Sequence, residues 1–484
     1  MTEIPATSNV STPPPSVKNL PPRPRVVIVG GGFAGLSAGM ALANMAVNVK
    51  LVDRRNHHTF QPLLYQVALA VLSPADIAQP IRSIFSKKRN VEVLMDEVVN
   101  IEADNRRVLL GSGAKLEYDY LILATGSTHS YFGKDEWAQY APGLKTVEDA
   151  TEIRRRVLLA FELAEREMVE TGAHPALNFV VIGGGPTGVE LAGAIADTSK
   201  LYMRHDFRHI DPAKSRVILL EGSPRILAAY PEDLSQKAVK QLAQLGVEVH
   251  TGQSVSDVKP GYVVVGGERV DAVVTLWAAG VQASPLGKML GVPVDKRGCA
   301  IVDGYLNPPG HPEIFVCGDL AHAEEAGRQI PGVAQPAMQM GRHAAQMILQ
   351  DMAGKPRTRF HYFDKGDMAT IGRQAAVANL QWPFKAHWSG LLAWLAWGTV
   401  HIFFLIGFRN RLAVFFQWAW TYLTFNRGAR LITGSPLLPG WGQQAGIRPQ
   451  VVRVPLDSTS PLLSLRPVPP PAEPARETKS REAS

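Results

Sequence analysis

The pattern of apolar positions along the chain predicts short buried strands that end at glycines. Runs rich in β-branched residues occupy residues 25–29, 178–182 and 313–317, and a glycine follows each run. The first two runs lead into stretches rich in Ala and Leu, which favour helix. Short apolar strands that pass through glycine into helices are typical of βαβ units. We therefore expect an α/β fold built on parallel sheets.

The pattern changes toward the C-terminus, where apolar and aromatic residues accumulate without acids. Between residues 368 and 456 no Asp or Glu occurs, and seven of the nine tryptophans lie at position 382 or later. Residues 388–408 carry no charged side chain, and residues 412–425 form a shorter apolar stretch beyond the basic segment 409–411. Tryptophan and arginine in this arrangement are typical of a membrane interface. Three interpretations stay open: two helices lying in the interface, a single transmembrane span, and a buried core or dimer helix.

Composition indicates a folded protein with an excess of basic residues. The 484 residues leave room for two or three domains, and 46% of them are apolar. The net charge of +7 suits an anionic partner. Because the C-terminal basic residues accompany aromatic ones, an acidic membrane surface is favoured over nucleic acid. Residues 1–24 and 433–484 are rich in Pro and polar residues, and we expect them to be largely disordered.

Cysteine and metal chemistry are excluded by counts and spacings. The two cysteines, Cys299 and Cys317, are too few for a disulfide scaffold or a four-cysteine zinc or iron–sulfur site. The chain also has no Cys-x-x-Cys redox pair. No His, Asp and Glu cluster has metal-ligand spacing, so we expect no metal.

The first glycine-rich segment has the sequence context of a dinucleotide site. Residues 30–35 fit G-x-G-x-x-G, follow a strand and open a helix. Glycines in this order permit a tight turn, close approach to a pyrophosphate, and close packing of helix on strand. A second strand ends at Asp53, 18 residues past the last glycine, where an acid is expected to bind a ribose. A purely structural turn would not need this acid. The residues expected to hold the nucleotide are Gly30, Gly32, Phe33, Ala34, Gly35 and Asp53.

The same pattern recurs at residues 183–188, again between a strand and a helix. Its acid, Glu221, lies 33 residues past the last glycine, at the end of the next apolar strand. A carboxylate there would bind the ribose diol and repel a 2′-phosphate, which favours NADH over NADPH. The residues expected at this site are Gly183, Gly185, Pro186, Thr187, Gly188 and Glu221. Two such sites in one chain indicate electron transfer between two dinucleotides, one of them a flavin.

Three further segments resemble the two-dinucleotide flavoproteins, which have the glutathione-reductase-like fold. Residues 118–127 look like their ATG segment, residues 276–280 like its partner after the nicotinamide domain, and residues 314–319 like the late FAD motif. The resemblance implies two Rossmann-like domains. It adds cofactor-binding residues: Thr125, Gly126, Gly280, Gly318 and Asp319, the last on the ribityl chain of the flavin. Relatives that reduce thiols use a Cys-x-x-Cys pair, and sulfide:quinone reductases typically use three cysteines, so an acceptor other than sulfur is expected.

Three local segments are similar to type II NADH dehydrogenases, the non-proton-pumping NADH:quinone oxidoreductases. They are HHTFQPLLYQVA at 57–68, the A-Q-x-A-x-Q-x-G element at 334–341, and residues 364–373. The resemblance extends over roughly residues 25–430. It implies non-covalent FAD, hydride transfer from NADH to flavin N5, and delivery of two electrons to a membrane quinone. It also favours two interfacial helices as the C-terminal membrane-association region.

The resemblance assigns roles to four polar residues, each with a plainer alternative. Gln335 and Gln339 would lie at the quinone head group, or they could share one solvated helix face. Lys365 would line the same pocket, or it could be an ordinary surface lysine. Glu190 would lie near the flavin–nicotinamide junction, or it could favour the first turn of its helix through the macrodipole.

These inferences predict a domain order, a location and two rival functions. The expected order is an arm (1–24), a first FAD-binding part (25–150), an NADH-binding domain (151–285), a second FAD-binding part with the quinone element (286–380), membrane-association helices (381–432) and a tail (433–484). The expected location is the cytoplasmic side of the inner membrane, with the lipid surface as a partner, a homodimer left open, and no nucleic acid. The rivals are a soluble NADH-linked flavoprotein reductase with another acceptor, and an NADH-sensing flavoprotein that acts mainly as an interaction partner.

Overall fold

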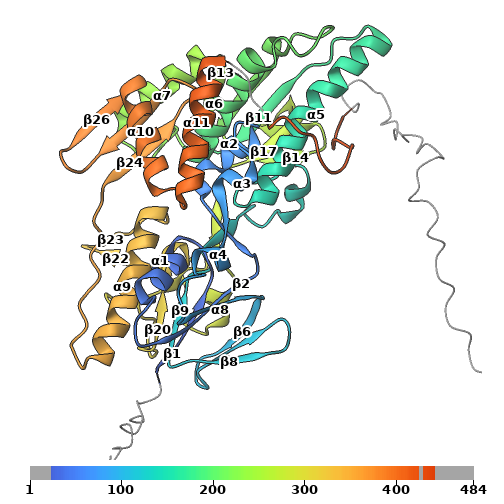
Figure 1. Cartoon of the computed structure of the whole chain (residues 1–484). Helices are drawn as coiled ribbons and strands as arrows, with labels where there is room; N and C mark the ends of the chain where they lie inside the picture. The colour runs from blue at the N-terminus through green and yellow to red at the C-terminus, as the bar shows by residue number, and fades with distance from the viewer. Residues whose placement is uncertain (1–22, 425–428, 442–484) are drawn as a thin grey trace, which may run out of the picture.

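The structure is a computed structural model that describes residues 23–424 and 429–441, arranged in two lobes (Figure 1). Most of the expected disordered arm and tail, residues 1–22 and 442–484, lies outside the described residues. One lobe is built on a five-stranded parallel sheet in the order β20-β9-β1-β2-β5. Its strands are β1 (Arg25–Val29), β2 (Asn48–Asp53), β5 (Val91–Met95), β9 (Tyr120–Leu123) and β20 (Ile314–Val316).

The second lobe repeats this plan around a four-stranded parallel sheet in the order β13-β12-β11-β17. Its strands are β11 (Asn178–Ile182), β12 (Arg216–Glu221), β13 (Val247–Thr251) and β17 (Val274–Trp277). Parallel strands need crossover connections, and helices supply them on the faces of both sheets. The predicted α/β class with two Rossmann-like sheets is confirmed.

Each lobe also carries a three-stranded antiparallel sheet between strands of its parallel sheet. These are β6 (Val98–Glu102), β7 (Arg107–Leu110) and β8 (Lys115–Glu117) in the first lobe, and β14 (Val255–Lys259), β15 (Tyr262–Val265) and β16 (Glu268–Asp271) in the second. One antiparallel pair joins the lobes: β10 (Ser127–His129) with β18 (Val281–Ala283). The shorter strands are β3 (His57–Thr59), β4 (Ala78–Pro80), β19 (Ala300–Ile301), β21 (Ala321–His322), β22 (Glu324–Glu325) and β23 (Arg328–Gln329).

The longer helices begin and end where their local chemistry requires. The 25-residue α5 starts at a capping box of Thr146 and Asp149 and ends at Gly172, whose φ is +72°. The longer helices are α1 (Phe33–Leu42), α5 (Val147–Thr171), α6 (Pro186–Asp197), α7 (Glu232–Gln244), α9 (Ala334–Met352), α10 (Leu391–Phe404) and α11 (Phe408–Thr424). The short helices are α2 (Leu64–Ala68), α3 (Pro74–Ile77), α4 (Ile81–Ile84) and α8 (Leu286–Met289).

The C-terminal region forms a small antiparallel sheet followed by two helices. The sheet contains β24 (Gly366–Thr370), β25 (Ala376–Leu380) and β26 (Ala386–Ser389). Two helices were expected, but the break between them is not at the basic segment 409–411. It lies at residues 405–407, because Leu405 is extended and Gly407 has a φ of +87°, so Arg409 and Arg411 fall in the first turn of α11.

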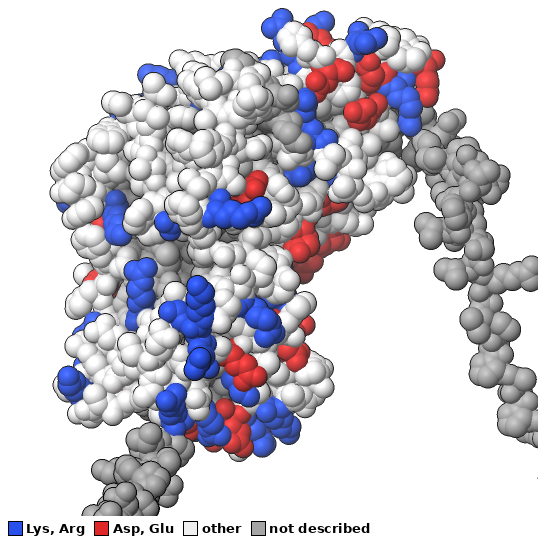
Figure 2. All heavy atoms as spheres, in the orientation of Figure 1, with Lys and Arg blue, Asp and Glu red and all other residues white. Residues whose placement is uncertain are grey.

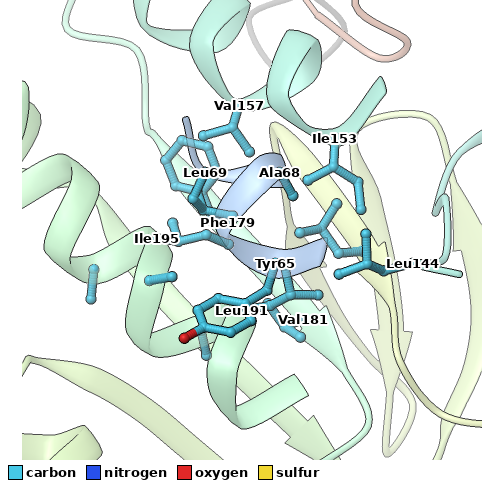
Figure 3. Packing of buried hydrophobic residues seen from close by; sticks show 14 of the residues in the cluster. Tyr65, Ala68, Leu69, Leu144, Ile153, Val157, Phe179, Val181, Leu191 and Ile195 are labelled. Carbon is cyan, nitrogen blue, oxygen red and sulfur yellow. The ribbon is translucent and has the colours of Figure 1, made fainter. Parts of the chain in front are cut away.

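One segment of the first half of the chain is buried in the second lobe. Residues 60–72, which contain α2, belong to the same apolar cluster as β11, α5 and α6. Figure 3 shows Tyr65, Ala68 and Leu69 enclosed between Val157 of α5 and Leu191 of α6. The two lobes therefore share a core and do not meet only at a linker.

Candidate functional site

The first glycine loop, between β1 and α1, is shaped by three glycines with different steric roles. Gly30 has a φ of +102°, and a Cβ there would lie 2.4 Å from the carbonyl oxygen of Ala124. A Cβ at Gly35 would lie 1.8 Å from the Gly30 oxygen, so helix and loop fit together only with glycine at this position. At Gly32 the nearest atom would be 4.0 Å away. The open side of the loop is therefore at Gly32, where a phosphate can approach the backbone.

The second glycine loop, between β11 and α6, reproduces this geometry. Gly183 has a φ of +109°, and a Cβ there would lie 2.5 Å from the backbone of Ala278. A Cβ at Gly188 would lie 1.8 Å from the Gly183 oxygen, and a Cβ at Gly185 would meet nothing within 4 Å. The two loops therefore have the same geometry, and in each the space beside the middle glycine is unobstructed.

The first helical turns behind the loops differ in their exposure. Pro186 and Thr187, at the start of α6, are both exposed. Proline suits this position because its missing N–H would have no helical partner. In α1 the Phe33 ring lies edge-on to His58, with ring centroids 5.1 Å apart. Ala34 is buried, and its backbone packs closely against Gly341 of α9.

The two predicted acids bind the loops in the same way. Asp53 accepts hydrogen bonds from the N–H groups of Gly31 at 2.6 Å and Arg55 at 2.7 Å. Glu221 accepts hydrogen bonds from the N–H groups of Gly184 at 2.5 Å and Ser223 at 2.7 Å. Each carboxylate oxygen keeps a second lone pair, so each acid can still accept from a ribose hydroxyl.

Asp319 lies in a polar group that joins the ends of β9 and β20. Its Oδ2 accepts a hydrogen bond from Ser127 Oγ at 2.7 Å, and the Lys145 ammonium lies 3.8 Å from the same carboxylate. Lys145 also donates to Ser127 at 3.0 Å. The Thr125 hydroxyl is buried with no hydrogen-bond partner among the described residues. Gly318, whose φ is +71°, starts the turn that presents Asp319.

The segments that carry Gly126 and Gly280 meet directly. The β10–β18 pair places them side by side: Ser284 donates its N–H to the Gly126 oxygen at 3.2 Å, and Ser130 donates to the Gly280 oxygen at 3.1 Å. A Cβ at Gly280 would lie 2.7 Å from the ring of Phe132. The flavin-type and nicotinamide-type motifs of the sequence are thereby brought to one place.

Gln335 and Gln339 do not form a solvated helix face. Both are partly buried in the first turns of α9 and bind residues 363–366, which lead into β24. The Gln335 amide donates to the Gly366 oxygen at 3.0 Å, and Gln339 exchanges two hydrogen bonds with the backbone of Phe363, at 3.0 and 2.9 Å. Gln335 Oε1 is buried without a partner among the described residues. This acceptor is free for a ligand.

Lys365 and Glu190 occupy contrasting environments. Lys365 is exposed, and its ammonium lies 5.5 Å from the ring centre of Phe404 on α10. Glu190 lies in the second turn of α6, so a helix-dipole role in the first turn does not apply. Burial of its carboxyl group raises the pKa of Glu190 to about 8, while the N–H of Thr370, 3.5 Å away, acts in the opposite direction.

Sequence reasoning missed three residues of this site. His58 is buried and its Nδ1–H donates to the Gly31 oxygen at 2.9 Å, which fixes the first glycine loop. Burial lowers the pKa of His58. Ser127 was within a quoted motif but had no assigned role, and Lys145 carried no signal because its contact with Asp319 spans 174 residues.

The two cysteines and the acidic side chains of the described residues form neither a disulfide nor a metal cluster. Cys299 and Cys317 are free and buried, and burial raises the pKa of the Cys299 thiol to about 11. Within residues 23–424 and 429–441, no group of three or more His, Cys, Asp or Glu side chains is arranged to hold a metal ion.

The helices α10 and α11 leave many large apolar side chains exposed. Figure 2 shows a broad uncharged surface over α10 and β26. The exposed apolar residues of these two helices are Leu391, Leu392, Leu395, Val400, Phe403, Phe408, Leu412, Phe415, Phe416, Trp420, Tyr422 and Leu423. None of the helices in the described part of the chain has both the length and the apolar character needed to cross a membrane.

Two protein families match the chain in succession. The family described as pyridine nucleotide-disulphide oxidoreductase matches residues 24–341, and the one described as NDH2 C-terminal domain matches residues 365–427. The first match contains both glycine loops, and the second contains the whole of β24, α10 and α11.

Similar proteins and structures carry related names. A type II NADH:quinone oxidoreductase of Mycobacterium tuberculosis is 42% identical over 428 residues, which cover 85% of this chain and 91% of that protein. An internal alternative NAD(P)H-ubiquinone oxidoreductase of Arabidopsis thaliana is 30% identical, covering 83% of this chain and 84% of that protein. The structure of NDH2 from Plasmodium falciparum in complex with NADH has a TM-score of 0.74 at 20% identity, covering 85% of this chain and all of that one. This last likeness supports the fold.

Proposed function

The chain belongs to the type II NADH:quinone oxidoreductases, the non-proton-pumping NADH dehydrogenases, and we propose that it uses FAD held non-covalently at the first glycine loop. The observation that carries this proposal is that both lobes contain a glycine loop of the same geometry. In each loop a carboxylate accepts a hydrogen bond from a backbone N–H group. Two dinucleotides can then bind face to face across the shared β10–β18 pair.

The residues of the first lobe suit FAD. The open side of Gly32 leaves room for the pyrophosphate, and Asp53 can accept from the adenosine ribose. Asp319, Ser127 and the unpaired hydroxyl of Thr125 offer polar partners to a ribityl chain. When bound, FAD would supply a two-electron carrier that takes hydride from NADH and reduces a quinone. We assign residues 25–150 and 286–380 to this cofactor and residues 151–285 to NADH.

The second loop would select NADH. Glu221 would bind the ribose diol and oppose a 2′-phosphate by charge. The nearest arginine in sequence, Arg225, does not offset this, because its guanidinium donates to the backbone oxygens of Leu227, Ala228 and Tyr230. An NADPH phosphate would therefore meet a carboxylate without a free guanidinium from this turn.

The quinone end would lie where α9 meets residues 363–366, at the start of β24. The free Oε1 of Gln335 can accept a hydrogen bond from a ligand N–H or hydroxyl group. Gln339 would act by fixing the backbone of Phe363, and Lys365 would add positive charge beside Phe404. Glu190, whose pKa is near 8, would hold or release a proton close to the nicotinamide side at neutral pH.

The protein would dock on the cytoplasmic face of the inner membrane through α10 and α11. Their exposed apolar side chains would enter the interface, while Arg409 and Arg411 attract anionic lipid. A quinone with a long apolar tail could then enter from the bilayer while NADH arrives from water. The sequence leaves open whether two copies of the chain form a homodimer.

One set of measurements tests the proposal. The protein is purified from membranes, its flavin is released by heat and identified by mass, and NADH oxidation is followed with a short-chain quinone. We expect FAD and quinone-dependent turnover. FMN in place of FAD would refute the cofactor. A yellow soluble protein whose flavin is bleached by NADH but not reoxidised by quinone would favour a soluble reductase or an NADH sensor instead.

A further inference from the structure

A chain of hydrogen bonds runs from the C-terminal helix α11 to the side chain of Thr370, whose backbone N–H faces Glu190. The Trp418 Nε1–H donates to Gln66 Oε1 at 2.7 Å, and the Gln66 amide nitrogen donates to the Tyr65 hydroxyl at 3.0 Å. The Tyr65 hydroxyl lies 2.9 Å from Thr370 Oγ1. The Thr370 N–H points at Glu190 Oε1 across 3.5 Å. The path joins α11, α2, β24 and α6, which come from four distant parts of the sequence.

The donors and acceptors along this path agree in direction. An indole N–H can only donate, so Gln66 must present its oxygen to Trp418 and its nitrogen to Tyr65. The Tyr65 oxygen then accepts from Gln66 and has a proton that can be donated to Thr370 Oγ1. The orientation of the Gln66 amide is therefore set by a residue of α11.

The path crosses a mostly apolar interior. Tyr65, Gln66 and Thr370 are 8%, 7% and 1% exposed, and Figure 3 shows Tyr65 beside Leu191 of α6 within this core. Buried polar groups that lose a partner destabilise the arrangement, so removing one member displaces its neighbours. A network that only stabilises the core would have no reason to reach the active site. This one ends at Thr370, whose backbone N–H faces the Glu190 carboxylate.

We propose that Trp418 and Tyr65 are positioning residues for Glu190, so that α11, when seated on α2, completes the nucleotide side of the active site. The proposal rests on the proposed role of Glu190 near the nicotinamide. Trp418 fixes Gln66, Gln66 fixes the Tyr65 hydroxyl, and Tyr65 holds the strand residue Thr370 at its place beside the carboxylate. Neither Trp418 nor Tyr65 is placed in contact with the reacting atoms.

The groups around Glu190 determine the direction in which its pKa should change when the path is broken. Burial opposes the charged carboxylate, and the Thr370 N–H favours it. Tyr230 interacts electrostatically with both Glu190 and Asp367, and burial raises the pKa values of Tyr230 and Asp367. Loss of the Thr370 contact would therefore raise the pKa of Glu190 further. A hydrogen bond of ordinary strength changes the ratio of neutral to charged carboxyl about fivefold. The Thr370 contact, at 3.5 Å, is longer than the ordinary range, so we expect a smaller change.

The test compares three single variants by rapid mixing. Trp418→Phe keeps an aromatic ring beside Trp397 but removes the indole N–H, and Tyr65→Phe removes one hydroxyl. Tyr262→Phe is the matched control, because it removes one tyrosine hydroxyl from β15, outside the path and outside the docking helices. The rate of anaerobic flavin bleaching by NADH is measured from pH 6 to 10, together with flavin content and Tm. We expect the pH midpoint to rise in the first two variants, and the control to keep the original midpoint.

A second arm repeats the measurement in a Glu190→Gln background. There Trp418→Phe should have no further effect on the pH profile. If Glu190→Gln leaves the profile of the parent protein unchanged, the proposed role of Glu190 is wrong and the inference is overturned with it. If the profile depends on Glu190 but Trp418→Phe and Tyr65→Phe keep the parent midpoint, or slow bleaching equally at every pH, the path is a structural network and the inference alone is overturned.

Discussion

Replacing Glu221 by glutamine isolates the charge that is proposed to select NADH. The side chain keeps its length, but it can no longer accept two hydrogen bonds through two oxygens. In the structure these go to the N–H of Gly184 at 2.5 Å and of Ser223 at 2.7 Å. With glutamine, one of these N–H groups faces an amide nitrogen, which also donates. The loop is therefore held less firmly, and the adenosine ribose loses an anionic acceptor.

The size of the effect follows from two opposing changes. A hydrogen bond with a charged partner contributes about 1.5–3 kcal/mol, so NADH loses binding. A 2′-phosphate charge about 5 Å from the carboxylate would be repelled by roughly 3 kcal/mol at an effective dielectric constant of 20, and this repulsion disappears in the variant. Half of the roughly 3 kcal/mol repulsion alone narrows the NADH:NADPH ratio of kcat/KM by about tenfold, because 1.4 kcal/mol corresponds to one factor of ten.

The assay measures kcat/KM for NADH and for NADPH with one soluble quinone. Glu248→Gln is the matched control, because it removes a carboxylate from the adjacent strand β13, where Glu248 pairs with Arg216 away from the loop. Flavin content is recorded for both variants, so that damage to the fold is visible. An unchanged ratio in Glu221→Gln, or an equal change in the control, would show that another group reads the ribose.

Three further predictions address the other parts of the site. Gly32→Leu should abolish flavin binding and give a colourless protein, because its side chain would fill the open side of the loop; full flavin content would contradict this. Gln335→Ala should leave bleaching by NADH nearly unchanged and slow reoxidation by quinone about tenfold or more, as measured by sequential rapid mixing; slower bleaching would move the residue to the nicotinamide side. The double variant Phe416→Glu with Leu423→Glu should leave membranes while keeping its flavin, because burying each side chain in the interface contributes about 1.5–3 kcal/mol; Val239→Glu on α7 is the control, and retention in the membrane pellet would refute the docking surface.

Local spacing predicted the parts of this site that depend on a few neighbouring residues. A tight turn, an open middle position and a close helix contact each demand glycine within six residues, so Gly30, Gly32 and Gly35 are visible without a structure. The strands β1 and β11 were likewise predicted at their observed bounds, because a short apolar run that ends at a glycine is typical of a buried strand.

Contacts between distant segments could not be predicted in this way. Nothing in the pattern around Lys145 indicates that it reaches Asp319, and the apolar run at 60–72 reads like any core segment. The sequence placed the break between α10 and α11 at residues 409–411. In the structure α10 ends at Phe404, and the extended Leu405 and Gly407, with its φ of +87°, separate it from α11. Backbone geometry decided this boundary, and arginines are tolerated within the first turn of an exposed helix.

The burial of residues 60–72 in the second lobe bears on how two nucleotide sites can cooperate. Hydride transfer requires the reacting atoms to come within roughly 3–3.5 Å, so the two glycine loops must keep a defined relative position. Arg154 of α5 donates to the Val67 oxygen at 2.8 and 2.6 Å and to the Leu72 oxygen at 2.9 Å, which clamps the segment that leaves the first lobe. A buried guanidinium is costly without such partners, so these backbone oxygens and the arginine stabilise each other's positions. Because this clamp and the β10–β18 pair tie the lobes at two separate places, the relative orientation of the two glycine loops is fixed by two sets of contacts.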